Sequence, residues 1–342
     1  MKRIAFFDTK PYDKIYFEKM KNEYGLEFKY FENKLNYENA FMAKGYDGAV
    51  AFVNDDIDAD TINCLYKCNI EVIAMRCSGY NNIDFKTAFG KIHILRVPVY
   101  SPYAVAEHAI ALLLCINRKI HKAYNRTRDN NFSINGLTGF DLYGKTVGVV
   151  GTGKIGQVFI DICKGFGMKI LAYDPYPIDD KDITYTDIDT LCRESDVISL
   201  HCPLTKETHH IINDRTIKMM KEDAIIINTS RGSLIDSEAL TNALVEERIG
   251  GAGLDVYEEE SELFFEDFSD KILKDNVLAR LVSLPNVIVT SHQAFLTKEA
   301  LENIAKVTCK NLYDYFAGNN LENEICYKCI KYGKCDRKGK CF

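Results

Sequence analysis

The segment KTVGVVGTGKIG, residues 145–156, decides how this chain folds. A short apolar run leads into a turn in which Gly151, Gly153 and Gly156 have the spacing GxGxxG, and an amphipathic helical pattern follows. The first glycine permits a tight turn, the second lets a pyrophosphate approach the backbone, and the third lets the helix pack closely on the strand. The phosphates would then lie at the positive N-terminal end of the helix. The segment predicts a dinucleotide-binding unit rather than a glycine turn that serves packing alone.

The cofactor type is indicated by Asp174, which ends the next predicted strand. An aspartate at this place accepts hydrogen bonds from the adenosine-ribose hydroxyls and repels a 2′-phosphate. The segment DPYPIDD that it begins contains no arginine to receive such a phosphate. NAD is therefore expected rather than NADP.

Short runs rich in Val, Ile and Phe alternate with helical segments along most of the chain. Such runs are typical of parallel sheets that are covered on both faces. A helical pattern from Ser101 to Asp129, with Pro102 at its first position, separates two groups of strands, and a last helix is expected over 297–316. The predicted strands are 3–8, 26–31, 48–53, 72–77 and 92–97 in the first group, and 145–150, 169–174, 196–201, 224–228, 251–256 and 286–291 in the second.

These patterns predict an α/β protein with two doubly wound parallel-sheet domains, a Rossmann NAD-binding domain inserted into a flavodoxin-like substrate domain. The substrate domain would comprise residues 1–100 plus 297–325, the NAD-binding domain residues 101–296, and a Cys-rich basic tail residues 326–342. The chain would cross between the domains twice. A hinge that closes on the site and expels water is therefore expected.

Composition narrows the class of protein further. The 342 residues are 46% apolar and 27% charged, and the net charge is −6. These values are ordinary for a globular protein and argue against a general nucleic-acid binder. No apolar stretch reaches membrane-spanning length and the N-terminus lacks a secretory pattern, so no membrane partner and a cytoplasmic location are expected.

A cation, a carboxylate and an imidazole follow strands of the second group: Arg231, Glu260 and His292. Ligands of open α/β sheets bind at the carboxyl ends of the strands, so these side chains are expected to converge there. We hypothesise that His292 protonates a carbonyl oxygen during reduction and that Glu260 fixes its tautomer and favours the imidazolium. Arg231 would hold a substrate carboxylate through two parallel hydrogen bonds.

Each of these residues also has a plainer interpretation. Arg231 could be a surface salt-bridge residue, and Glu260 belongs to an acidic run that is typical of a solvated loop. Their joint position after a complete dinucleotide motif favours the catalytic interpretation. His201 also follows a strand and is the rival base, although it is expected to border the cofactor. His108 is expected to be a packed or hinge histidine, and Asp255 to serve the nicotinamide end or the electrostatics of the site.

The loop RCSGYNN, residues 76–82, ends a strand of the first group. Backbone N–H groups around Ser78 and Gly79 could bind a small carboxylate. Tyr100 lies at the predicted domain crossing and is a second candidate substrate contact. All three could also be ordinary loop residues.

The segments RVPVYSPYAVAEHA, LTGFDLYGKTVGVVGTGKIG, DVISLHCPLT, NTSRGSLIDS, GLDVYEEESELFFED and HQAFLTKEAL resemble the D-isomer-specific 2-hydroxyacid dehydrogenase family, and most closely its bacterial D-lactate branch. The resemblance spans about residues 1–325. It implies NADH-dependent reduction of pyruvate to D-lactate in a homo-oligomer, with Arg231, Glu260 and His292 as catalytic residues. A dehydrogenase for bulkier 2-keto acids and an NADH-sensing binding protein are the alternatives. The implied cofactor contacts are Lys154, Ile155, Asp174, Cys202, Pro203, Thr208, Thr229, Ser230 and Asp255.

The tail CYKCIKYGKCDRKGKCF departs from the family, whose members typically end near Glu324. It contains six Lys or Arg against one Asp, and its cysteines have the spacing C-x2-C-x5-C-x5-C. This spacing could hold one tetrahedral Zn²⁺, while a disordered thiol-rich tail and a regulatory disulfide are the alternatives. The other eight cysteines are expected to be reduced and packed as small apolar residues. The candidate zinc ligands are Cys326, Cys329, Cys335 and Cys341.

Overall fold

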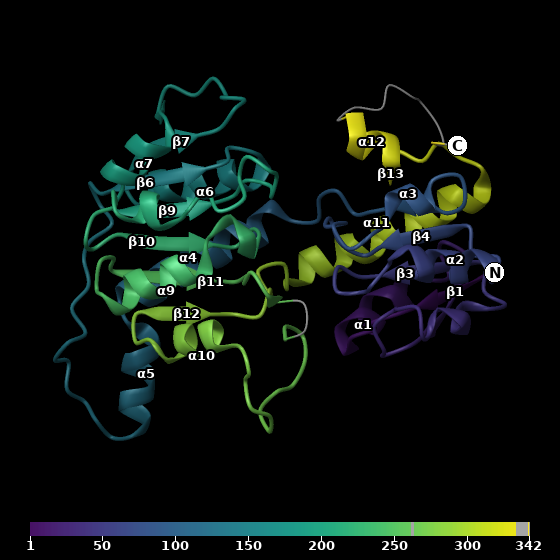
Figure 1. Ribbon diagram of the computed structural model, residues 1–342, viewed down its shortest axis with the longest axis horizontal. Coiled ribbons are helices and arrows are strands. Elements are labelled where there is room, and N and C mark those ends of the chain that lie inside the picture. Colours follow the sequence, from purple (N-terminus) through teal and green to yellow (C-terminus); the bar gives the residue numbers. More distant parts are fainter. Residues whose placement is uncertain (261–262, 333–340, 342) are drawn as a thin grey trace. The chain divides into compact units, whose positions relative to one another are not determined.

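The computed structural model describes residues 1–260, 263–332 and 341, and it divides the chain into two compact units (Figure 1). Unit 1 comprises Met1–Ser101 and Leu296–Phe342, and unit 2 comprises Pro102–Phe295. The chain therefore leaves unit 1 once and returns to it once. Cys335, one of the predicted zinc ligands, lies outside the described residues.

Unit 1 is built on a six-stranded sheet with the order β13-β5-β4-β3-β1-β2. Strands β3 and β4 are buried along their whole length, which explains their continuous apolar sequences. The described strands are β1 (Lys2–Phe6), β2 (Leu26–Tyr30), β3 (Gly48–Ala51), β4 (Val72–Met75), β5 (His93–Leu95) and β13 (Glu324–Ile325). The helices are α1 (Pro11–Met20), η1 (Ala40–Ala43), α2 (Ala59–Lys67), α3 (Phe85–Ala88), α11 (Lys298–Ala317) and α12 (Tyr327–Tyr332).

The predicted fold class is confirmed, but the sheet of unit 1 is mixed because one edge strand is antiparallel. Strand β13 pairs with β5 in the antiparallel direction, with Glu324 opposite Leu95 and Ile325 opposite Ile94. The chain can reach this edge because α11 ends at Gly318, whose φ of 73° terminates the helix in the left-handed conformation. Two residues are too few to show any strand periodicity in a sequence.

Unit 2 contains a seven-stranded sheet with the order β12-β11-β10-β9-β6-β7-β8, in which all pairs are parallel. The chain order reverses between β6 and β9, which is the switch point where open α/β sheets bind ligands. The strands are β6 (Thr146–Val150), β7 (Lys169–Tyr173), β8 (Ile183–Tyr185), β9 (Val197–Leu200), β10 (Ile225–Asn228), β11 (Gly251–Leu254) and β12 (Val287–Val289). The helices are α4 (Pro102–Asn117), α5 (Ile120–Arg128), α6 (Lys154–Gly165), α7 (Ile188–Glu194), α8 (Asp214–Ile217), η2 (Gly232–Leu234), α9 (Ser237–Val245) and α10 (Asn276–Ser283).

The single long helix predicted from Ser101 to Asp129 is in fact two helices, α4 and α5. Helix α4 ends at Asn117, whose side-chain amide both donates to and accepts from the backbone of Phe140, at 2.8 and 2.9 Å. Lys119 then adopts a left-handed conformation with φ 51° before α5 begins. Burial explains the break: α4 is largely buried, whereas α5 has no buried residue.

Helix α4 lies close against the sheet because β11 has the sequence GAGL. A Cβ added at Gly253 would lie 3.0 Å from the Cβ of Leu112 and 3.0 Å from Cδ1 of Ile116. Leu113 of the same helix is fully buried, and truncating such a residue to alanine typically costs about 2–5 kcal/mol. None of the described helices is long and apolar enough to cross a membrane.

Candidate active site

The glycine turn after β6 has the geometry that its sequence predicts. Gly151 has φ 99°, and a Cβ there would lie 2.7 Å from the backbone nitrogen of Cys202. A Cβ at Gly156 would lie 2.0 Å from the carbonyl oxygen of Gly151, so only glycine lets α6 approach the turn. Gly153 differs, because a Cβ there would meet no protein atom within 4 Å. Two glycines thus serve packing, and the third faces open space that a ligand can occupy.

Two neighbours of this turn are also predicted cofactor contacts. Lys154 is exposed and begins α6, while Ile155 is half-buried and packs against the apolar core under α4 and α6. The first turn of α6 therefore presents backbone N–H groups and a lysine at its outer end. This arrangement suits an anionic group.

Asp174 follows the last residue of β7 and fastens the glycine turn to it. One carboxylate oxygen accepts a hydrogen bond from the backbone N–H of Thr152 at 2.7 Å, and the other accepts from the N–H of Tyr176 at 2.8 Å. The residue remains half-exposed. Asp174 thus has a structural role that the sequence did not suggest, in addition to the predicted ribose contact.

The loop after β9 carries three of the predicted cofactor contacts. The hydroxyl of Thr208 donates to the carbonyl oxygen of Pro203 at 2.7 Å, and the hydroxyl of Ser230 donates to that of Cys202 at 2.7 Å. These bonds fix the loop internally and join it to the turn after β10. Burial raises the pKa of Cys202 to about 12, so its thiol stays protonated and acts as a packing group.

The turn that carries Arg231 is shaped by its neighbours. The side-chain amide of Asn228 accepts from the N–H of Ser230 at 3.0 Å and donates to the carbonyl oxygen of Arg231 at 2.8 Å. A Cβ at Gly232 would lie 2.1 Å from the carbonyl carbon of Tyr257, so this turn rests directly on the backbone that follows β11. Gly232 thus lets the turn that carries Arg231 lie against the segment that carries Glu260.

Thr229, between Asn228 and Ser230, is buried, and its hydroxyl has no hydrogen-bond partner among the described residues. A buried hydroxyl normally finds a partner, because leaving it unpaired costs about 1–3 kcal/mol. The unpaired Thr229 hydroxyl and the open space at Gly153 both fit a bound dinucleotide, which would supply a partner for the first and fill the second.

His292 and Glu260 form a close pair in unit 2. His292 Nδ1 lies 2.9 Å from Glu260 Oε1, while Glu260 Oε2 accepts from the N–H of Tyr257 at 2.9 Å. Both side chains are only 18% exposed, so water screens the pair weakly. Because Nδ1 faces the carboxylate, Nε2 is the nitrogen that can act on a substrate.

Asp255 proves to be the anchor of the turn that carries His292. Its fully buried carboxylate accepts three hydrogen bonds, from the Thr290 hydroxyl at 2.5 Å and from the N–H groups of Gln293 and Ala294 at 2.9 and 2.8 Å. Its carbonyl oxygen accepts from the N–H of His292 at 2.7 Å. His292 has φ 51°, and a left-handed residue of this kind costs roughly 1–2 kcal/mol. The bonds to Asp255 offset that strain and hold the imidazole in place.

His108 joins the same network, which the sequence interpretation as a packed or hinge histidine missed. Its Nε2 lies 3.1 Å from the Thr290 hydroxyl and 3.4 Å from a carboxylate oxygen of Asp255. Asn228 was also missed. Two signals in the sequence could have indicated these residues. His108 is a polar residue on the largely apolar helix α4, and Asn228 ends the strand that precedes Arg231.

His201, the rival base, has a different environment. Its Nε2 lies 2.9 Å from the Ser199 hydroxyl, and its ring centre is 4.7 Å from that of Phe159. Burial lowers its pKa to about 3, so the imidazole is neutral at ordinary pH and lacks the second ring proton that a general acid would give. These contacts favour His292 as the acid.

The predicted substrate loop of unit 1 is held from two sides. Arg96 donates to the carbonyl oxygen of Ser78 at 3.0 Å, and the Cys77 thiol lies 3.3 Å from the carbonyl oxygen of Gly79. The carbonyl oxygen of Tyr100 accepts from the Asn303 side chain at 2.7 Å. The candidate substrate contacts therefore lie on ordered segments of unit 1.

Arg76, which precedes this loop, is fully buried beside two carboxylates. It donates to the carbonyl oxygen of Asp8 at 2.6 Å, and its guanidinium lies 3.6 Å from the Asp8 carboxylate and 3.4 Å from that of Asp13. Removing one member of a buried ion cluster typically costs about 3–5 kcal/mol. The cluster anchors the root of the loop.

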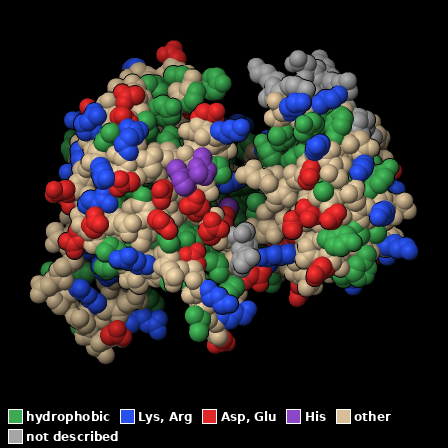
Figure 2. Space-filling model, in the orientation of Figure 1, with side chains coloured by type: hydrophobic (Ala, Val, Ile, Leu, Met, Phe, Trp, Pro, Cys, Tyr) green, Lys and Arg blue, Asp and Glu red, His purple; other side chains and the backbone are tan. Residues whose placement is uncertain are grey.

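Two groups of side chains among the described residues have metal-ligating chemistry. One is on unit 2, where His209, His210 and Glu258 offer ligand atoms within 4.8 Å of one another, and Figure 2 shows histidine side chains beside acidic ones on the surface of that unit. His210 Nε2 already lies 2.6 Å from Glu258 Oε1, so these two side chains are hydrogen-bonded to each other. The other group consists of Cys326, Cys329 and Cys341 in unit 1.

Comparison with known proteins assigns the chain to a class. A family model for the NAD-binding domain of the D-isomer specific 2-hydroxyacid dehydrogenases matches residues 110–294. That span holds the glycine turn, Asp174, Arg231 and the His292–Glu260 pair. The chain belongs to the D-isomer specific 2-hydroxyacid dehydrogenase family and is an NAD-dependent enzyme of that family.

Individual relatives narrow the comparison. The chain is 48% identical over 328 residues to the D-lactate dehydrogenase of Escherichia coli, which covers 94% of this chain and 99% of that protein. It is 46% identical over 328 residues, with the same coverage, to a 2-hydroxyacid dehydrogenase homologue of Haemophilus influenzae. Among solved structures, apo D-lactate dehydrogenase of E. coli matches with a TM-score of 0.86 at 45% identity, covering 94% of this chain and 99% of that one. The pyruvate reductase of Chlamydomonas reinhardtii matches with a TM-score of 0.90 at 41% identity, covering 94% and 98%.

Proposed function

We propose that this enzyme is a D-lactate dehydrogenase that reduces pyruvate to D-lactate with NADH and catalyses the reverse reaction. The observation that carries the proposal is the His292–Glu260 pair at 2.9 Å, held at the strand ends of the NAD-binding unit beside the Arg231 turn. The high identity to D-lactate dehydrogenases supports the choice of substrate.

In the proposed mechanism, the glycine turn after β6 would hold NADH, which would supply the hydride. Arg231 binds the carboxylate of pyruvate, because its planar guanidinium matches a carboxylate with two parallel hydrogen bonds. This contact fixes the orientation of the 2-keto group in the site. It also places positive charge near the carbonyl oxygen on which negative charge develops.

His292 donates the proton that completes the reduction. Glu260 accepts a hydrogen bond from Nδ1, so the proton that His292 transfers is the one on Nε2. Nε2 gives this proton to the carbonyl oxygen as the C–H bond forms, and in D-lactate oxidation it takes the hydroxyl proton back. Asp255 holds the His292 turn and positions the imidazole without touching the substrate.

The cofactor contacts that we propose are those implied by the family resemblance. Lys154 and Ile155 begin α6 at the glycine turn, and the Thr229 hydroxyl gains its missing partner from the cofactor. Asp174 would bind the adenosine ribose. The remaining proposed contacts are Cys202, Pro203, Thr208, Ser230 and Asp255 for NAD, and Ser78, Gly79 and Tyr100 for the substrate.

The decisive experiment measures NADH oxidation with pyruvate, 2-ketobutyrate and phenylpyruvate and determines the chirality of the product by chiral chromatography. The proposal expects the highest kcat/KM with pyruvate and D-lactate as the product. A higher kcat/KM with phenylpyruvate would indicate a dehydrogenase for bulkier 2-keto acids. Tight NADH binding without oxidation would indicate a sensor of NADH instead of an enzyme for this reaction.

The direction of the reaction gives a second test. Pyruvate reduction uses the imidazolium of His292, so its rate is expected to fall as pH rises, whereas D-lactate oxidation uses the neutral imidazole and is expected to rise. Parallel pH profiles in the two directions would contradict this role for His292.

The homo-oligomer and the cytoplasmic location stay predictions. Light scattering of the purified protein can check the first, and fractionation of cells can check the second.

A further inference from the structure

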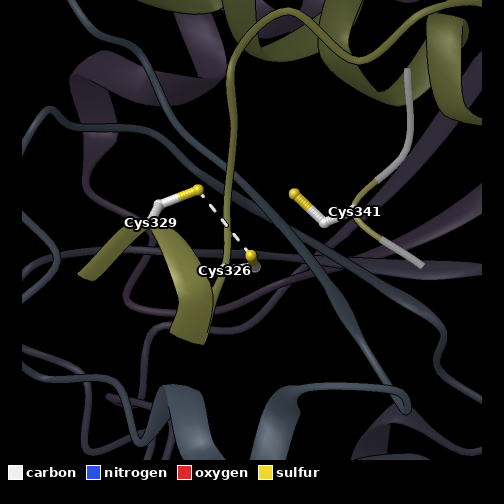
Figure 3. Close-up of side chains that lie close together, drawn as sticks. All are labelled: Cys326, Cys329 and Cys341. Atoms are coloured by element: carbon white, nitrogen blue, oxygen red, sulfur yellow. Dashed lines mark hydrogen bonds between the residues drawn. The ribbon is translucent and has the colours of Figure 1, made fainter. Parts of the chain in front are cut away.

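The C-terminal segment after α11 gathers three cysteines at one place in unit 1. Cys326 follows β13 directly, Cys329 lies in α12, and Cys341 returns from further along the chain (Figure 3). Their sulfur atoms all lie within 4.8 Å of one another. Cys326 and Cys341 are only 4% and 6% exposed, so these thiols are directed inward.

The spacing of the sulfurs fits a metal better than a disulfide. Cys326 Sγ and Cys329 Sγ are 3.7 Å apart. Zinc–sulfur bonds of about 2.3 Å in a tetrahedron separate neighbouring sulfurs by about 3.8 Å, whereas a disulfide needs about 2.05 Å. A third thiol within the same radius has no place in a single disulfide but completes three corners of a tetrahedron.

The segment is held in this arrangement by Glu324 of β13. One carboxylate oxygen lies 2.5 Å from Nδ1 of His93 in β5, and the other accepts the backbone N–H of Cys341 at 2.7 Å. Glu324 therefore ties Cys341 to the sheet edge, where Cys326 lies between β13 and α12. The three ligands are positioned by backbone pairing and a buried carboxylate.

Helix α12, which carries Cys329, also packs on unit 1. Lys328 lies 5.1 Å above the ring of Phe89, the residue that directly follows α3. This contact helps to hold α12 on the same unit as Cys326 and Cys341.

We propose that Cys326, Cys329 and Cys341 bind one Zn²⁺ ion, which fixes the C-terminal segment to the β13 edge of the unit 1 sheet. Each thiol releases its proton when its sulfur binds the metal, so no oxidant or reductant is needed. The site is structural, because none of its residues belongs to the proposed reaction. The relatives named above align with 94% of this chain but with 98–99% of their own length.

The test uses the full-length protein, purified under reducing conditions from cells grown with zinc. Elemental analysis is expected to find about one zinc per chain. Replacing zinc with Co²⁺ should produce thiolate-to-metal charge-transfer bands in the near ultraviolet and intense d–d bands of tetrahedral cobalt. The variants Cys326→Ser, Cys329→Ser and Cys341→Ser should each lose most of the zinc and these bands.

Cys64→Ser is the matched control, because Cys64 is a half-buried thiol of α2 in the same unit and lies outside the cluster. It should keep the zinc of the unaltered protein. Chelation should lower the melting temperature and leave kcat/KM for pyruvate within about twofold, which also shows that the tested chains are folded. The metal readouts do not depend on the reaction, so they stand whichever substrate the enzyme uses.

Three outcomes would overturn the proposal. The first is protein that contains no zinc and gives no cobalt bands. The second is a mass under non-reducing conditions that is two hydrogens lighter, with the loss mapped to a bond between two of the three cysteines. The third is a loss of zinc from Cys64→Ser equal to that of the cluster variants, since the metal would then bind elsewhere.

Discussion

Replacing Glu260 with glutamine tests the proposed mechanism most directly, because it removes a charge and keeps the shape. In the unaltered protein one oxygen of Glu260 faces His292 Nδ1 at 2.9 Å and the other accepts the N–H of Tyr257 at 2.9 Å. Both positions need an acceptor when the imidazole is protonated. A glutamine has only one oxygen, so its NH₂ group must face either the backbone N–H or the imidazolium N–H.

The size of the effect follows from this conflict. A hydrogen bond to a charged group contributes about 1.5–3 kcal/mol, and both side chains are only 18% exposed, so solvent offers little replacement. A loss of this size in the transition state lowers kcat/KM about 10- to 150-fold. The dissociation constant of NADH should stay unchanged, because Glu260 is not among the proposed cofactor contacts.

The assay is steady-state pyruvate reduction, with NADH binding followed by fluorescence. Glu259→Gln is the matched control: it makes the same chemical change one residue away, at an exposed position. It should stay within about twofold of the unaltered enzyme. The reasoning fails if the two variants lose activity equally, or if Glu260→Gln loses less than about threefold.

Three further predictions concern other residues. Arg231→Lys replaces a bidentate guanidinium with an ammonium point charge, so kcat/KM for pyruvate should fall at least about tenfold while the affinity for NADH is kept. Unchanged KM and kcat would show that Arg231 does not bind the substrate. Asp174→Ala removes the acceptor of the Thr152 N–H and also the predicted ribose contact. The affinity for NADH should therefore fall about tenfold or more, and the ratio of the affinities for NADH and NADPH should decrease. A preserved preference would contradict the ribose assignment. Burial lowers the pKa of His201 from 6.5 to about 3. As pH falls below 6.5, this histidine therefore becomes protonated in the unfolded state but stays neutral in the folded state. Between pH 7 and 5 this residue should cost about 2 kcal/mol of stability, and His201→Asn should show a correspondingly smaller decline in urea unfolding; equal declines would refute the burial argument.

Most strands could be predicted because they are apolar runs between polar or glycine-rich turns, as in β3 and β4, or alternate apolar and charged residues, as in β2. The glycine turn could also be predicted, because each of its three glycines meets a separate steric requirement and the GxGxxG spacing alone indicates all three. Strands β8 and β13 escaped prediction because they have three and two residues, lie at sheet edges and show no periodicity. The break before Lys119 escaped because it depends on the pairing of Asn117 with Phe140, which no local pattern records.

Some of the polar residues of the site could likewise be predicted from the sequence, and others could not. Glu260 and His292 follow neighbouring strands of one parallel sheet, so their pairing could be predicted from topology. The position of the Arg231 guanidinium beside them stays a prediction. The role of Asp255 as an anchor could not, because its partners become visible only when the turn after β12 is folded over the end of β11. His108 is 182 residues from Thr290 in sequence, and only the packing of α4 on the sheet brings them together.

The anchoring of the His292 turn by Asp255 bears on any attempt to transplant this chemistry. A designer who copied only the histidine and its glutamate onto another parallel sheet would inherit a left-handed residue with nothing to secure it. The turn would relax and the imidazole would swing away from the aligned position. The transferable unit is therefore larger than the catalytic pair: it consists of the ends of two adjacent strands, with the aspartate on one and residues 290–294 on the other.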